Sequence, residues 1–143
     1  MNTMSIAAGL AAAAFLGAAG YGLQAAMTTP PTLMSPVDYG RALDALAGST
    51  GAALARCAAA PQDSRALCRA RARTEDTIAR ADLDARYYGT VQAQAQAQDV
   101  HARARFELAR LECVARGDDR ARCLSQARVE QAKALAAAKL AAG

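Results

Sequence analysis

The chain has 143 residues, a net charge of +4, 53% hydrophobic residues and only 4% aromatic residues, with no tryptophan. Alanine supplies most of the apolar fraction, so hydrophobic burial has few large side chains on which to act, and the length allows one domain with a small core. The basic and acidic residues are interleaved, without the basic stripe and stacking aromatic groups of a nucleic-acid-binding module, so we expect no nucleic-acid partner.

The first segment of the chain is apolar. Residues 6–27 carry no charge, and a helix of this length spans about 33 Å, enough to cross the hydrocarbon core of a bilayer. Small residues and a proline-bearing stretch follow, as they do after a secretory signal, although the first five residues lack Lys and Arg. We therefore predict a cleaved signal peptide or an uncleaved membrane anchor over residues 1–27, with a buried helix as a third possibility, and a linker over residues 28–35.

A well-marked helix start follows the linker. Ser35 can cap a helix whose first position is Pro36, and Pro61 removes an amide donor and ends it. Apolar and cysteine side chains recur at steps of three and four residues, which predicts one packed face: Leu43, Leu46, Thr50, Leu54 and Cys57. Gly48 and Gly51 each cost about 1 kcal/mol relative to alanine and are candidate positions for a break or kink.

Three more helices are expected after this turn. The second should run from about Ser64 to Tyr88, where Gly89 can take the left-handed conformation that closes helices. Residues 92–98 alternate Gln and Ala with a period of two, but both residues favour helix, so we interpret them as helix or as a frayed connection. Gly117 should end the third helix, and the fourth should run to the end of the chain.

These elements predict an all-α fold of two helical hairpins. The helical domain would cover residues 36–143, with hairpins at 36–89 and 90–143. Residues 63–75 and 118–130 match at seven of thirteen positions, including an aspartate, a cysteine and a glutamate. Because these three types are uncommon in the chain, an internal duplication is expected.

The four cysteines sit at corresponding places in the two hairpins. In each copy the first cysteine lies just before the turn and the second lies shortly after it, at similar heights on antiparallel neighbours. We therefore predict the disulfides Cys57–Cys68 and Cys113–Cys123. By the loop-entropy relation each would contribute about 2.7 kcal/mol to stability. This contribution would compensate for a core that contains many alanines and few large side chains. Disulfides persist in an oxidising compartment, which is the bacterial periplasm or the outside of the cell.

Other chemistry is weakly signalled. Thiolate binding of zinc or copper is a lower-ranked alternative, because structural zinc sites pair cysteines two to four residues apart. The only histidine, His101, is expected at solvent, and no serine or cysteine has a histidine that could activate it. Tyr87 and Tyr88 could mark a contact surface, although packing of one hairpin on the other is the simpler expectation. We predict no enzymatic activity, no cofactor and no metal.

The order of motifs resembles a group of small secreted, Ala- and Lys-rich helical proteins of proteobacteria. The resemblance rests on SPVDYGRALD, on EDTIARADLDARYY and on the two paired-cysteine turns around it, and it covers residues 35–139. It implies a helical protein of the periplasm and implies no activity. This chain departs from the group by using arginine where those proteins prefer lysine.

Two functional classes follow as expectations. The first is a non-enzymatic protein of the periplasm or cell envelope with a structural or interaction role, which binds an unknown envelope protein or itself. The second is a single-span accessory subunit of an inner-membrane complex, with a periplasmic helical domain and membrane contact only through residues 6–27. Binding of a metal or an anionic polymer is a third, lower-ranked expectation.

Overall fold

The computed structural model describes residues 33–142, apart from the side chain of Asp118. It contains four helices, α1 (Pro36–Ala58), α2 (Gln62–Tyr88), α3 (Val91–Ala115) and α4 (Arg120–Ala142), with a 3₁₀ turn η1 (Gly117–Asp119) between the last two. The prediction of an all-α fold with two disulfide-linked helix pairs is confirmed. The signal peptide or anchor expected over residues 1–27 lies outside the described residues.

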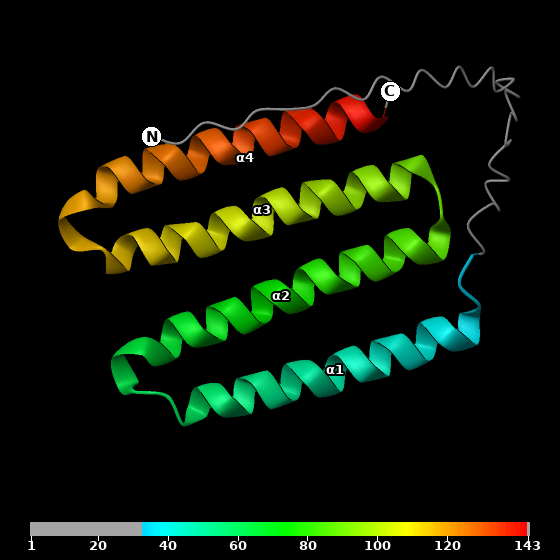
Figure 1. The fold of residues 1–143 in the computed structure, drawn as a ribbon, viewed down its shortest axis with the longest axis horizontal. Coiled ribbons are helices and arrows are strands. Elements are labelled where there is room, and N and C mark those ends of the chain that lie inside the picture. The colour runs from blue at the N-terminus through cyan, green and yellow to red at the C-terminus, as the bar shows by residue number, and fades with distance from the viewer. Residues whose placement is uncertain (1–32, 143) are drawn as a thin grey trace, which may run out of the picture.

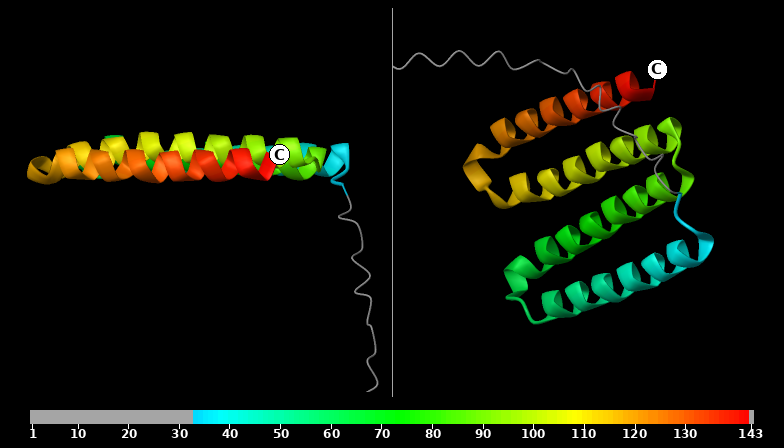
Figure 2. Two further views of the ribbon diagram at one scale, coloured as in Figure 1. Left: turned by 90° about the horizontal axis from the view of Figure 1, so that it is seen from above. Right: turned by 45° about the vertical axis from the view of Figure 1, so that its right-hand side comes forward.

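The helices form a single antiparallel layer. They lie side by side in chain order (Figure 1), and the layer is one helix thick when seen from above (Figure 2). Within the described residues, each helix packs only on its neighbours in the sequence, so α1 contacts α2 alone and α4 packs on α3 and the η1 turn. The two hairpins therefore extend one another sideways and do not close into a four-helix bundle.

Local signals set the ends of α1 and α2. The Ser35 hydroxyl accepts a hydrogen bond from the Asp38 backbone N–H at 3.1 Å, and α2 ends at Gly89, whose φ is 63°. The helix does not break at the candidate positions Gly48 and Gly51, because α1 continues to Ala58. The start of α2 at residue 62 also precedes the expected start, since Pro61 takes the cap position.

Residues 92–98 belong to α3 and are not a frayed connection. The Thr90 hydroxyl accepts a hydrogen bond from the Ala93 N–H at 3.0 Å and caps the helix. Ala93 and Ala97, four residues apart, are buried, whereas the glutamines between them are exposed. The alternation of Gln and Ala therefore places alanines four residues apart on one face of a helix.

The core consists of three narrow seams between neighbouring helices. Within the described residues its buried members are six alanines, two cysteines and one leucine: Ala72, Ala85, Ala93, Ala97, Ala102, Ala138, Cys57, Cys113 and Leu83. Small side chains let helix axes approach closely, but they remove little apolar surface from water. The layer therefore depends on additional contacts for its stability.

Aromatic side chains stabilise the first hairpin internally. The rings of Tyr39 on α1 and Tyr87 on α2 stack with centroids 4.3 Å apart, and the Tyr39 hydroxyl donates a hydrogen bond to the Asp84 carboxylate. Tyr88 is 60% exposed. The expectation that both tyrosines pack one hairpin on the other is therefore wrong, because the ring that packs does so within a single hairpin.

Tyr39 gives a testable pH dependence. The hydrogen bond to Asp84, together with desolvation, raises the pKa of Tyr39 above its ordinary value. Because the folded protein favours the neutral phenol, this contribution to stability is present below pH 10 and is lost as the pH rises through the folded pKa. We expect a loss of stability in this alkaline range, measured by urea unfolding, that is smaller in Tyr39→Phe. Equal alkaline losses in both proteins would contradict the assignment.

Candidate functional site

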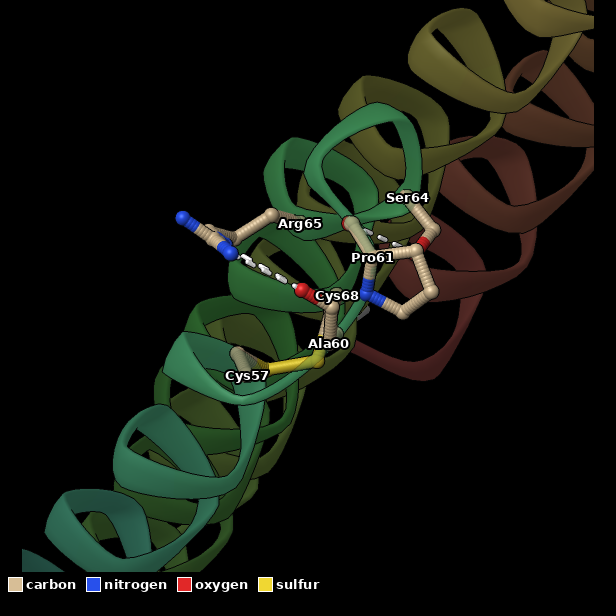
Figure 3. The surroundings of a disulfide bond; sticks show 6 residues. All are labelled: Cys57, Ala60, Pro61, Ser64, Arg65 and Cys68. Carbon is tan, nitrogen blue, oxygen red and sulfur yellow. Dashed lines mark hydrogen bonds between the residues drawn. A yellow bond between two sulfur atoms is a disulfide. The ribbon is translucent and has the colours of Figure 1, made fainter.

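The first predicted disulfide joins the end of α1 to the second turn of α2. Cys57 is 2% exposed, and its Cα lies 5.5 Å from that of Cys68. The Arg65 guanidinium donates two hydrogen bonds to the Ala60 carbonyl oxygen, at 3.0 and 3.3 Å, and so bridges the turn beside the disulfide (Figure 3). The Ser64 hydroxyl donates to the Pro61 carbonyl oxygen in the same turn. The turn is therefore closed by covalent and hydrogen bonds together.

The second disulfide repeats this arrangement between α3 and α4. Cys113 is 1% exposed, and its Cα also lies 5.5 Å from that of its partner, Cys123. All four cysteines are thus oxidised, which leaves no thiolate to bind zinc or copper. Among the described residues, no group of three or more His, Cys, Asp or Glu side chains is placed to hold a metal ion.

Both disulfide-closed turns lie at the same edge of the layer, opposite the edge where residue 33 enters (Figure 1). We call this the arginine edge and define it as residues 54–71 and 110–125. Its basic residues are all arginine: Arg56, Arg65, Arg69, Arg71, Arg110, Arg116, Arg120 and Arg122. Its acids are Asp63, Glu112, Asp118 and Asp119. The excess of four arginines equals the net charge of +4 of the whole chain, so the remaining residues are electrically balanced.

Two polar contacts join the hairpins across the seam between α2 and α3. Arg71 donates two hydrogen bonds to Glu112, at 2.8 and 3.1 Å, and His101 Nε2 lies 2.8 Å from Asp82 Oδ1. The His101 side chain is only 15% exposed. The expectation that it is a solvated residue is therefore wrong, because α2 places a carboxylate opposite it. No periodicity within α3 could have revealed that partner.

A similar polar contact supports α1 against α2. Asp76 accepts hydrogen bonds from Arg80 at 2.9 Å and from the Thr50 hydroxyl of α1 at 2.8 Å. The Arg80 bond, assisted by the Thr50 bond, holds the pKa of Asp76 below its ordinary value despite partial desolvation. The charged carboxylate is therefore the form that these contacts favour.

Shallow grooves follow the seams between the helices. One of about 510 Å³ runs between α3 and α4, and its lining includes both cysteines of the second disulfide together with His101, Arg105, Glu112, Arg116 and Glu130. In this groove His101 contacts Asp82 and Glu112 contacts Arg71. The grooves and the arginine edge offer surfaces for binding by charge and hydrogen bonds.

None of the helices within residues 33–142 combines the length and apolar character that a bilayer crossing needs. Protein-family models, curated proteins and solved structures were compared with the chain. None of them matches it. The features that bear on function are therefore the disulfides, the exposed surfaces and the distribution of charge.

Proposed function

We propose that this chain is a non-enzymatic protein of the cell envelope that acts in the periplasm or outside the cell by binding other molecules. The observation that carries the proposal is the pair of disulfides, because intramolecular disulfides are typical of oxidising compartments. The apolar residues 6–27 support the same location, since they have the length of an export or anchoring segment.

The single-layer architecture supports a binding role. Globular domains usually consist of two layers of secondary structure that pack against each other. Here there is one layer, and both of its faces are uncovered within the described residues. A one-helix-thick layer offers a large surface in proportion to its core. The partner would be another envelope molecule or a second copy of the chain.

Intact-mass spectrometry of protein from the envelope fraction tests the location and the disulfides together. We expect no alkylation of the native protein and alkylation of four cysteines after reduction, because all four are paired. Four reactive thiols in fully folded native protein would contradict the proposal. Recovery of the protein only from the cytoplasm would contradict it as well.

A second candidate is a single-span accessory subunit of an inner-membrane complex. It is favoured by exposed apolar side chains at the edge where residue 33 enters the layer: Leu33, Val37, Tyr88, Val91 and Leu140. Such side chains suit a position close to a bilayer or to the spans of a partner. The same mass measurement separates the candidates, because a retained Met1 favours the subunit and a mature start at residues 20–28 removes it.

A further inference from the structure

The arginine edge contains guanidinium groups that are available to a ligand. Arg71, Arg110 and Arg122 have carboxylate partners, and Arg65 donates to a backbone carbonyl. Four more arginines are exposed and have no ion pair among the side chains that the structure describes: Arg56, Arg69, Arg116 and Arg120. Two of them lie at each disulfide-closed turn, so the positive charge extends over both hairpins.

Guanidinium groups are suited to phosphate. Their planar N–H donors form two parallel hydrogen bonds with a phosphate, and they are less strongly hydrated than an ammonium group. Both lysines of the chain, Lys133 and Lys139, lie outside the arginine edge. The cations of this edge are therefore all of the type that binds phosphate in a bidentate manner.

Exposed apolar side chains lie among these arginines. Leu111 and Val114, in the last turns of α3, are 51% and 52% exposed. A soluble polyanion would leave them in contact with water. At the surface of a bilayer, arginines reach the headgroup phosphates while nearby apolar side chains reach the boundary of the acyl chains.

We propose that the arginine edge binds the surface of a bilayer that contains anionic phospholipids. The inference rests on the proposed function, because it names the partner of an exported envelope protein. Arginines of both turns contact headgroup phosphates, and Leu111 and Val114 enter the interface between them. The arginine edge lies at the opposite end of the helices from residue 33, and a helix of 23 residues such as α1 is about 35 Å long.

Co-sedimentation of the full chain with lipid vesicles tests the proposal. The vesicles contain phosphatidylcholine alone or with 40% phosphatidylglycerol, at about 100 mM salt. An edge variant replaces four exposed arginines with glutamine: Arg56, Arg69, Arg116 and Arg120. A matched control removes the same charge at exposed positions in the parts of the helices remote from the arginine edge: Arg41→Gln, Arg86→Gln, Lys133→Gln and Lys139→Gln.

The wild-type chain is expected to bind the anionic vesicles more tightly than the neutral ones. Each arginine at an anionic surface strengthens binding about fivefold, so the edge variant should bind at least about a hundredfold more weakly. The control should lose less than about threefold, because charges beyond a Debye length of about 10 Å are screened. Equal losses in the two variants, or equal binding of wild type to both vesicles, would overturn the proposal.

Leu111→Ser with Val114→Ser separates a membrane from a soluble polyanion. We expect this double variant to lose about tenfold in binding to anionic vesicles and to keep its binding to inorganic polyphosphate. Unchanged vesicle binding, or wild-type binding to polyphosphate without binding to vesicles, would overturn the proposal. Either failure leaves the envelope location intact, because the alkylation measurement on native protein tests that location independently.

Discussion

Replacing Cys57 and Cys68 with alanine is expected to lower the free energy of unfolding by about 2.7 kcal/mol. The sequence separation of 11 residues sets this magnitude through the loop entropy of the unfolded chain. The free energy of unfolding of a small domain is usually roughly 5–15 kcal/mol, so this loss would be a large fraction of the total stability. Urea unfolding of the variant and the wild type, followed by circular dichroism, measures it.

The loss should also be local. Within the described residues α1 packs only on α2, so the helix that loses its disulfide has no second neighbour to hold it. We expect amide hydrogen exchange of α1 to accelerate while α3 and α4 stay protected. Cys113→Ala with Cys123→Ala is the matched control and should instead expose α4. If either variant loses protection uniformly over all four helices, the layer unfolds as one cooperative unit and this expectation is wrong.

Leu83→Ala is expected to lower the free energy of unfolding by about 2 to 3 kcal/mol. Leu83 is 2% exposed and is the only buried residue larger than cysteine among those that the structure describes. Removing its methyl groups takes away apolar burial and leaves a cavity, and the open layer can partly collapse into that space, which places the effect near the low end for such substitutions. Thermal or urea unfolding provides the measurement.

Leu140→Ala is the control for this substitution. Leu140 is 84% exposed, so the same change of side chain should alter the free energy of unfolding by less than about 0.5 kcal/mol. A comparable loss at both positions would mean that α4 buries Leu140 against a further surface, such as a second copy of the chain. A negligible loss at Leu83 would mean that the seams of α2 depend on their polar contacts.

The prediction of two disulfide-linked hairpins succeeded because its signals are local. A cap at Ser35, a proline at residue 61 and left-handed glycines at residues 89 and 117 act within one turn of the chain. Once two helices are joined by a short turn, cysteines placed on either side of it fall at the same height. Their pairing therefore follows from the sequence spacing alone.

Side-chain partners across the seams were not predictable in the same way. The pairing of His101 with Asp82 and the stacking of Tyr87 on Tyr39 depend on how α2 is rotated against each neighbour. Alanines occur on several sides of α2 and α3, so the apolar periodicity of these two helices does not single out one packed face. Only the arrangement of the helices in space decided those contacts.

By itself the sequence determined four helices, their turns and the two covalent links, because capping, helix propensity and loop closure operate over a few residues. Only the tertiary structure decided that the hairpins extend into one open layer, which brings both turns and their arginines to a single edge. The physical reason is that small side chains permit close approach on several faces, so the choice among them depends on long-range contacts. That choice concentrates the net charge on one edge.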